Sequence, residues 1–336
     1  MPTARSLADV PAILKEYVQG SDHPDLQVYR RDLADDEFLN VWLWRARQYC
    51  DLGNFYGKRV LEVGCGFGWD AAGLALIGNN EIVACDILPS MVDGMSQCLE
   101  AMKAKNKPLP VTPLQGDICT LDLPDASFDG IFSTEAIEHV HDLGQMFDAC
   151  HRLLRPGGTA VIANDSNRYN AAARNHSWEG WTERDESWDH VEWLKSEVRP
   201  VEHAAAEPYG VMREKTIRAT APDLDDSSVA RLRAATAGMI HNEIGPAVEQ
   251  FKRDGSLPTR DEFGWCRNPE TGEYSERLLD PFELRNMLQA RGFKVQLRHL
   301  FRKMPLAVFN GVQFKPLNIR LFALRPQFVL VARKIA

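Results

Sequence analysis

Residues 60–68 read Val60-Leu61-Glu62-Val63-Gly64-Cys65-Gly66-Phe67-Gly68, an apolar run that breaks into alternating glycines. A stretch of helical character follows from Trp69 to Ile77, so the pattern predicts a strand, a tight turn and a helix. Glycine has no Cβ atom, which lets the backbone turn sharply and approach a ligand closely. The spacing differs from the Gly-x-Gly-x-x-Gly of dinucleotide-binding enzymes. Taken alone, such a turn could simply connect two elements.

The next predicted strand ends in an acidic residue. Glu81 to Cys85 form this strand, and Asp86 follows it. In a βαβ unit, an acid about 20 positions past the glycines is placed to accept hydrogen bonds from ribose hydroxyls. The alternative is that Asp86 caps the helix that Pro89 and Ser90 begin. We favour the ribose role, because the spacing and the position at the strand end both agree with it.

Later segments continue the alternation of strands and helices. Strands are predicted over residues 111–115, 128–133 and 159–163. A helix is predicted over residues 143–154, and it ends at Arg155-Pro156-Gly157-Gly158, a turn that cannot continue a helix. Polar residues follow two of these strands, because Asp117 lies after the first and Thr134 and Glu135 lie after the second.

Four segments together resemble a known family. They are VLEVGCGFG (60–68), ACDILPSMV (84–92), LQGDICTLDLPDASFDGIFSTEAIEHV (114–140) and RLLRPGGTAVIA (152–163). In this order they resemble the motifs of class I S-adenosylmethionine-dependent methyltransferases, with a core like that of the type 11 and ubiquinone-pathway O-methyltransferase groups. The match runs over residues 59–164 and resumes at 280–299 and 327–334. It implies an α/β fold with a Rossmann-like, mostly parallel sheet of seven strands, the last of them antiparallel.

The resemblance also implies that S-adenosylmethionine is bound by the loops that follow these strands. The loop from Gly64 to Gly68 would lie under the methionine part. Asp86 would hold the ribose, and Asp117 would accept the exocyclic amine of adenine. The expected cofactor-binding residues are Glu62, Gly64, Cys65, Gly66, Gly68, Asp86, Ile87, Asp117, Ile118 and Thr134.

The chain is longer than this core requires, and we divide it into four parts. They are 1–57, N-terminal helices that close over the cofactor or pack on the sheet; 58–165, the cofactor-binding core; 166–279, an inserted substrate cap; and 280–336, the rest of the core sheet with its last helix. Helices are expected over residues 8–20 and 34–50. In the cap, a helical pattern runs over residues 227–253 and is interrupted by Gly245-Pro246. The connection over residues 301–326 is long and apolar.

Glu135, Glu138 and His139 occupy positions i, i+3 and i+4, which share one face of a helix. Two carboxylates and an imidazole suit a divalent cation. The pattern resembles the metal-binding segment of ubiquinone-pathway O-methyltransferases and of small-RNA 3′-terminal 2′-O-methyltransferases. Many members of the superfamily have a similar Glu-His-Val stretch that only shapes the pocket, and we favour this metal-free interpretation. His139 and His141 are then the candidate general bases for methyl transfer to a hydroxyl.

The inserted cap is rich in aromatic residues. Half of the eight tryptophans of the chain fall between Trp178 and Trp193. Large side chains help a small cap to bury enough area, but they can also form a wall for a sugar ring, an aromatic acceptor or an amine. We expect this segment to act as a substrate lid. The expected acceptor-binding residues are Glu135, Trp181, Trp188, His190 and His241.

Composition narrows the classes of function. The 336 residues have a formal net charge of −8, which argues against non-specific nucleic-acid binding, since that binding needs clustered cations. No run of about 18 apolar residues is present, so no membrane span is expected. The N-terminus lacks an apolar signal region and the seven cysteines are scattered, so we expect a cytoplasmic protein with reduced thiols. The oligomeric state stays open.

The sequence therefore predicts a methyltransferase that acts on a small-molecule or glycan-precursor acceptor, most simply by O-methylation. N-methylation of a small amine is the first alternative, because an amine loses its proton without a strong base. Metal-dependent RNA 2′-O-methylation is a further alternative, which the acidic charge and the lack of an aromatic, basic platform disfavour. A cofactor-binding module without activity is disfavoured because the donor-binding positions look intact.

Overall fold

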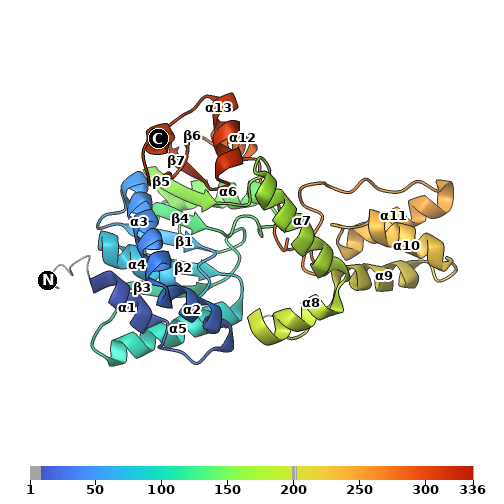
Figure 1. Ribbon diagram of the computed structural model, residues 1–336, viewed down its shortest axis with the longest axis horizontal. Helices are drawn as coiled ribbons and strands as arrows, with labels where there is room; N and C mark the ends of the chain where they lie inside the picture. The colour runs from blue at the N-terminus through green and yellow to red at the C-terminus, as the bar shows by residue number, and fades with distance from the viewer. Residues whose placement is uncertain (1–8, 199–200, 202, 336) are drawn as a thin grey trace.

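The computed structural model describes residues 9–198, 201 and 203–335. In that part of the chain, seven strands form one sheet in the order β3-β2-β1-β4-β5-β7-β6 (Figure 1). The strands are β1 Arg59–Val63, β2 Glu81–Asp86, β3 Val111–Gln115, β4 Phe128–Thr134, β5 Leu154–Asn164, β6 Phe293–Arg298 and β7 Phe328–Lys334. Strand β7 pairs antiparallel with both β5 and β6, while the pairs among β1 to β5 are parallel. The predicted α/β sheet is confirmed, including its antiparallel last strand.

Helices cover both faces of this sheet because successive strand residues point to opposite sides and most of them are apolar. Val60 packs into one buried cluster and Leu61 into another. On the Val60 face lie α1 Val10–Tyr17, α2 Gln27–Ala34, α3 Asp36–Gly53, α4 Trp69–Gly78 and α5 Pro89–Ala104. On the Leu61 face lie α6 Leu143–Leu153, α12 Pro281–Ala290 and α13 Lys315–Leu324. All seven cysteines are free thiols and six of them are buried.

Several boundaries differ from the sequence-based expectations. Strand β5 begins at Leu154, so the Arg-Pro-Gly-Gly segment lies inside the strand rather than before it. Helix α2 and the short 3₁₀ helix Pro24–Leu26 were not anticipated, and the long connection before β7 contains the 3₁₀ helix Leu306–Phe309 and α13. The connection is apolar because α13 packs its apolar side chains against the core of the sheet.

The insert forms a helical cap that extends from one side of the core (Figure 1). Its elements are α7 Ala171–Glu186, α8 Trp188–Trp193, the π-helix Leu194–Val198, α9 Tyr209–Thr220, α10 Asp226–Ala235 and α11 His241–Asp254. The expected helix break at Gly245-Pro246 is wrong, because Pro246 lies inside α11. The chain instead breaks between α10 and α11, where Gly238 has φ +90°, a conformation that glycine adopts without steric cost.

The cap has small apolar clusters of its own and a buried ion pair. Trp181 packs edge-on against Trp265 in one of these clusters. Between α7 and α9, the Arg213 guanidinium donates to both carboxylate oxygens of Asp185, at 2.6 and 2.9 Å. Both residues are buried. The cap is therefore a packed unit and not an extended loop.

Hydrogen bonds join the cap to the core at its base and to the N-terminal region beyond α8. At its base, the backbone N–H of Leu279 donates to the Ser166 carbonyl at 2.6 Å, and that of Arg168 donates to the Leu279 carbonyl at 3.1 Å. Beyond α8, the chain meets the N-terminal region, where the Gln27 side chain donates to the Glu197 carbonyl at 2.9 Å. Among the described residues, no helix is both long and apolar enough to cross a membrane.

Candidate cofactor and acceptor site

The glycine loop after β1 has the backbone geometry that its sequence predicts. Gly64 and Gly66 have φ values of +72° and +52°, which side chains rarely permit. A Cβ atom on Gly64 would lie 2.3 Å from the Cβ of Ala136, so only glycine fits there. At Gly66 the nearest atom to such a Cβ would be the Tyr29 hydroxyl at 3.8 Å. The backbone at Gly66 is thus open to close approach by a ligand.

Asp86 closes this loop onto the end of β2. Its Oδ2 accepts from the Gly66 N–H at 2.8 Å, and its Oδ1 accepts from the Leu88 N–H at 3.0 Å. The N-cap of α5 is Leu88, so Asp86 is not the helix cap itself. Carboxylate oxygens have further lone pairs, so the two hydrogen bonds orient the group and still leave acceptor capacity for ribose hydroxyls.

Glu62 is a buried acid at the base of the same loop. Its side chain is 2% exposed, and its Oε2 has no hydrogen-bond partner among the described residues. Burial first, and then the nearby carboxylates of Asp70 and Asp86, raise the pKa of Glu62 well above its usual value. An uncompensated buried acid beside a ligand-binding loop fits a cationic group of the ligand, such as the ammonium of a methionine moiety.

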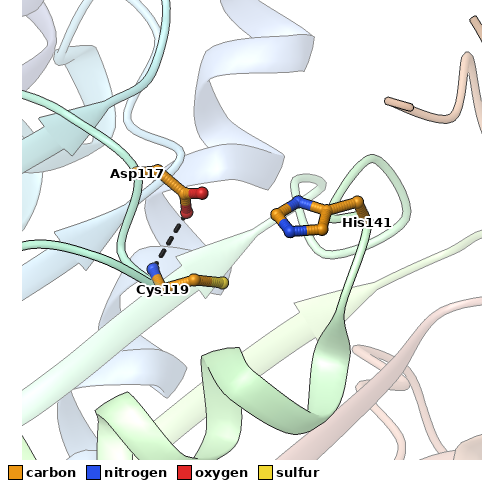
Figure 2. Close-up of side chains that lie close together, drawn as sticks. All are labelled: Asp117, Cys119 and His141. Carbon is orange, nitrogen blue, oxygen red and sulfur yellow. Dashed lines mark hydrogen bonds between the residues drawn. The ribbon is translucent and has the colours of Figure 1, made fainter. Parts of the chain in front are cut away.

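Asp117 and Ile118 are the residues expected to flank adenine, and Ile87 is a further expected cofactor-binding residue. The Asp117 Oδ1 accepts from the backbone N–H of Cys119 at 2.9 Å. Polar atoms of Asp117, Cys119 and His141 all lie within 4.8 Å of one another, and Figure 2 shows His141 facing Asp117. The apolar side chain of Ile87 is 46% exposed, which suits contact with a flat ring. Ile118, in contrast, is buried in the hydrophobic core on the Leu61 face of the sheet.

The cluster of Asp117, Cys119 and His141 is a poor metal site despite its compactness. Burial and the charge of Asp117 raise the pKa of the Cys119 thiol to about 12. Metals bind the thiolate, so a thiol that resists ionisation disfavours coordination. His141 lies beside Asp117, and its expected role as a catalytic base stays a prediction.

The candidate acceptor residues that follow β4 lie where the backbone turns unusually. Glu135 has φ +43°, in the left-handed region that non-glycine residues seldom occupy. Its Oε2 accepts from the Asp165 N–H at 2.9 Å, which ties the ends of β4 and β5 together. Water reaches Glu135, but desolvation by surrounding atoms and the carboxylates of Asp165 and Glu138 raise its pKa well above the usual value.

Glu138 and His139 follow on the same short segment. Glu138 is 3% exposed, and its Oε2 accepts from the Asn164 side-chain amide. His139 is exposed, and its Nδ1 lies 2.9 Å from the Tyr274 carbonyl. Because a carbonyl only accepts, this contact places the proton on Nδ1 and leaves the Nε2 lone pair available. The Nε2 atom lies 3.8 Å from Glu138 Oε1.

The expected metal triplet does not converge. The ligand atoms of Glu135, Glu138 and His139 do not all lie within 4.8 Å of one another, as those of the Asp117 cluster do. The segment from Ala136 to Val140 forms turns and not a regular helix, so the assumption of a shared helical face fails. One oxygen of Glu138 is engaged by Asn164 and one of Glu135 by Asp165. As arranged, these residues do not form a metal-binding set.

Three residues of this region were missed by sequence reasoning. Asp165 follows the end of β5, the same strand-end position that singled out Asp86 and Asp117, so a signal was present. Glu276 comes from the returning end of the cap. Burial raises its pKa, with His139 opposing that shift and Asp165 adding to it. Tyr274 lies on the same returning segment, and nothing local in the sequence indicates that it contacts His139.

The expected acceptor residues of the cap are not gathered in one place. Trp181 is buried in the cap core, so its ring supports the cap and does not face a ligand. Trp188 is 47% exposed on α8 and stays available. His190 lies 3.2 Å from Glu183. The Nδ1 of His241 lies 2.6 Å from the hydroxyl of Thr216, in a hollow between α9 and α11 that cap residues alone line.

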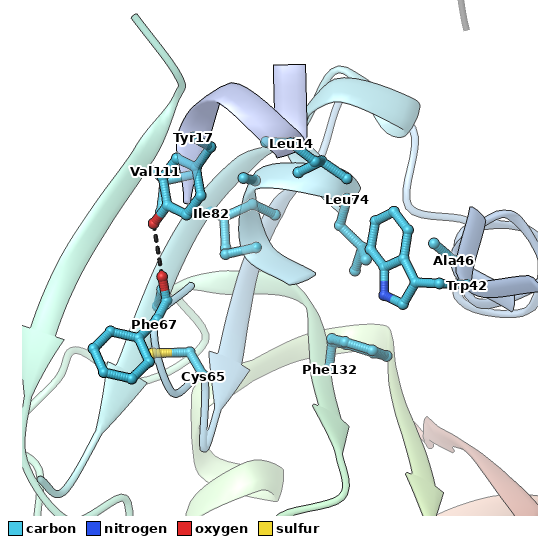
Figure 3. Close-up of a cluster of buried hydrophobic side chains, with 14 of the residues drawn as sticks. Leu14, Tyr17, Trp42, Ala46, Cys65, Phe67, Leu74, Ile82, Val111 and Phe132 are labelled. Carbon is cyan, nitrogen blue, oxygen red and sulfur yellow. Dashed lines mark hydrogen bonds between the residues drawn. The ribbon is translucent and has the colours of Figure 1, made fainter. Parts of the chain in front are cut away.

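The N-terminal helices contact the glycine loop directly. The Tyr17 hydroxyl of α1 donates to the Phe67 carbonyl at 2.7 Å, as Figure 3 shows. Tyr29 of α2 packs edge-on against the ring of Phe67, with centroids 5.4 Å apart. Helices α1 and α2 thus pack against the glycine loop at Phe67, next to the open backbone at Gly66.

Comparison with known proteins agrees with this geometry. Residues 61–162 match the family model described as a methyltransferase domain. Sterol 24-C-methyltransferase of Yarrowia lipolytica is 32% identical over 102 residues, 30% of this chain and 26% of that protein. Ubiquinone biosynthesis O-methyltransferase of Alkalilimnicola ehrlichii is 30% identical over 115 residues, 33% of this chain and 43% of that protein. A solved S-adenosylmethionine-dependent methyltransferase from Mesorhizobium loti has a TM-score of 0.43 and 16% identity, over 86% of this chain and 96% of that one.

Residues 61–162 thus form a methyltransferase domain. This match covers less than half of the chain, and the core that contains it is similar to S-adenosylmethionine-dependent methyltransferases. The chain spans less than half the length of the two curated relatives named above, 26% and 43%. The family-model match lies entirely in the core, before the cap begins.

Proposed function

We propose that this protein transfers a methyl group from S-adenosylmethionine to a small-molecule acceptor held between the core and the cap. The observation that carries the proposal is the glycine loop: its open backbone at Gly66 is held by Asp86, with the unpartnered acid of Glu62 below it. This combination suits a ligand that has both a diol and a cationic group. The methyltransferase domain match over the same loop supports the assignment.

Each end of the site would hold a different part of the donor. Asp86 would accept from the ribose hydroxyls, Ile87 would contact the adenine face, and Asp117 would accept from its exocyclic amine. Glu62 would compensate the methionine ammonium. When bound, S-adenosylmethionine supplies an electrophilic methyl group on sulfur. The protein's part is then to place a nucleophile in line with that methyl group and to exclude water.

For a hydroxyl acceptor, His139 would be the general base. Its Nδ1 is held by the Tyr274 carbonyl, so Nε2 can take the hydroxyl proton. Glu138 lies beside Nε2 and would stabilise the imidazolium that forms. The cap segment thus orients a core histidine, which couples acceptor enclosure to the chemistry.

An amine acceptor is the second candidate, and a specific observation favours it. Three carboxyl groups of this region, Glu135, Glu138 and Glu276, have raised pKa values, with burial as the first cause for each. A cationic amine placed among them would favour their ionised forms and bind tightly. In that case the carboxylates select the acceptor, and a base contributes little.

Donor binding is tested by calorimetry with S-adenosylhomocysteine. Replacing Asp86 with alanine should weaken binding at least about tenfold, since charge-assisted hydrogen bonds to the ribose are lost. Asp93→Ala is the matched control, because Asp93 is an exposed acid on α5. Equal affinities for wild type and the Asp86 variant would refute the proposed donor site.

The acceptor class is tested by measuring formation of S-adenosylhomocysteine with a panel of phenols, sugars and primary amines. For a hydroxyl, His139→Ala should lower kcat by about 10²-fold or more, whereas His141→Ala should mainly weaken donor binding. For an amine, His139→Ala should have little effect, and Glu276→Gln should raise KM. If the protein binds S-adenosylhomocysteine but methylates neither the hydroxyl compounds nor the amines of the panel, the proposed methyl transfer is contradicted and a cofactor-binding role remains.

A further inference from the structure

A second hollow lies near the amino end of β1, whereas the glycine loop follows the carboxyl end of that strand. It has a volume of about 510 Å³ and is bounded by the end of α3, the residues just before β1 and the exposed face of β5, β7 and β6. The glycine loop follows the carboxyl end of β1, whereas Lys58 precedes the strand's first residue. The hollow is therefore separate from the methyl-transfer site by the length of the strands.

Four basic side chains line this hollow: Lys58, Arg155, Lys294 and Arg333. The protein as a whole has a formal net charge of −8, so a local excess of cations is not a consequence of composition. Lys294 and Arg333 lie directly opposite each other on the antiparallel strands β6 and β7. Like charges in this position repel each other and destabilise the sheet. Among the residues that the structure describes, neither has an acidic partner at ion-pair distance.

The acid that lines the hollow does not neutralise this excess. Asp129 Oδ1 lies 2.7 Å from Arg155 Nη1, and its Oδ2 accepts from the backbone N–H of Arg59 at 3.0 Å. Asp129 therefore pairs with Arg155 and also attracts Lys58, which lowers the pKa of Asp129 against the opposing effect of burial, so the uncompensated charges are those of Lys294 and Arg333. The remaining lining groups include hydrogen-bond donors, Asn54 and Gln296, that can orient an oxyanion.

We propose that this hollow binds a small polyanion that has a diphosphate group. The charges converge in a concave site whose volume falls within the range typical of small-ligand pockets, about 300–1,000 Å³. A diphosphate would bridge Lys294 and Arg333 and convert their repulsion into attraction, with Lys58 on the third side. A nucleic acid would need an extended basic stripe, which an acidic protein with one concave cluster does not provide. Because the hollow is remote from the glycine loop, its ligand is distinct from the methyl donor and acceptor.

Calorimetric titration of the full chain with pyrophosphate and with ADP tests this proposal. Binding of both with similar affinity identifies the diphosphate as the recognised group. Tighter binding of ADP shows that an attached nucleoside adds contacts, such as those offered by Leu52 and Val331 in the same hollow. Binding of neither ligand overturns the proposal.

Charge reversal provides the decisive variant. Lys294→Glu should reduce pyrophosphate affinity at least about tenfold, because a cation is lost and a repulsive carboxylate replaces it. The same change should raise the Tm of the free protein, since the new acid faces Arg333 across the strands. Lys303→Glu is the control, because Lys303 is an exposed lysine outside the hollow. Undiminished affinity in the Lys294 variant, or an equal loss in the control, would overturn the assignment. Unchanged binding of S-adenosylhomocysteine by all variants would show that the two sites are separate, and a parallel loss would contradict it.

Discussion

At the scale of single residues, Glu62 is the most informative side chain of the proposed donor site. A sequence pattern places an acid before the glycines, but only the structure shows that it is buried and lacks a partner for Oε2 among the described residues. Burial and the nearby carboxylates of Asp70 and Asp86 raise the pKa of this carboxyl group well above its usual value, which favours the protonated form. The group is therefore poised to respond to a cation that arrives beside it.

We predict that S-adenosylhomocysteine binding releases protons from Glu62. The ligand's ammonium stabilises the ionised carboxylate, so the pKa of Glu62 falls on binding and the proton leaves. Because binding releases protons, the affinity should increase as the pH rises. This increase should continue above the pH range in which an ordinary glutamate titrates, and it should stop once Glu62 of the free protein is itself ionised. Calorimetry at one pH in two buffers of different ionisation enthalpy measures the proton count. In Glu62→Gln the release should vanish; release of the same size in that variant would assign it to another group.

At the scale of elements, the contact between α3 and α4 shows how closely the helices over the donor site are packed (Figure 3). Trp42 of α3 donates from Nε1 to the Asp70 carboxylate at 2.6 Å. Its ring lies against Gly73, where a Cβ atom would be only 2.1 Å from Trp42 Cη2. Gly73 therefore permits the tryptophan to seat on α4, which begins at the glycine loop.

Two Gly→Ala substitutions in helices should change stability in opposite directions. Gly73→Ala should lower the free energy of unfolding by about 1–3 kcal/mol, because overpacking against Trp42 outweighs the gain in helix propensity. Gly180→Ala in α7 should raise it by about 0.5–1 kcal/mol, since no atom lies within 4 Å of the added methyl group. Urea unfolding followed by circular dichroism measures both. A stabilising Gly73 variant would show that α3 moves aside easily.

The sequence predicts local features of these elements and fails where distant segments meet. The strand, turn and helix from Val60 to Ile77 follow from apolar pattern and glycine placement, and they are confirmed. The meeting of His139 with Tyr274 joins residues 135 positions apart. No local pattern encodes that contact, because it depends on where the cap returns to the core.

The cap illustrates the same limit with its aromatic residues. Composition correctly marks the segment as rich in large side chains, but it does not tell a packed ring from an exposed one. Trp181 is buried and Trp188 is half exposed, although they lie only seven residues apart, on the successive helices α7 and α8. The distinction arises from Trp265, which comes from the far end of the insert and packs against Trp181. Whether Trp188 contacts an acceptor stays a prediction.

At the scale of the whole molecule, core and cap have separate buried cores. The cap depends strongly on the ion pair between Asp185 and Arg213, whose charges are both removed from water. Breaking one half of such a pair leaves an uncompensated charge, which typically costs about 3–5 kcal/mol. Loss of this pair should therefore loosen the cap before the core.

We predict that Asp185→Ala makes the cap sensitive to limited proteolysis while the core still binds S-adenosylhomocysteine. Cleavage should fall within residues 171–254, and donor affinity should stay within about twofold of wild type, since no donor-site residue is touched. Glu186→Ala is the control, because that neighbouring acid is exposed. Simultaneous loss of donor binding and of all protease resistance would mean that core and cap unfold as one unit.

The base of the cap, where Leu279 pairs with Asn167, has a consequence for how proteins with this architecture diversify. The insert leaves and re-enters the core at neighbouring backbone positions, so the strands on either side are joined in the same way whatever lies between. An exchange of this module during evolution would alter which acceptors are admitted and leave the donor machinery intact. For an engineer, the same junction marks where a foreign cap can be grafted: the Ser166 and Leu279 backbones already supply the closing hydrogen bond.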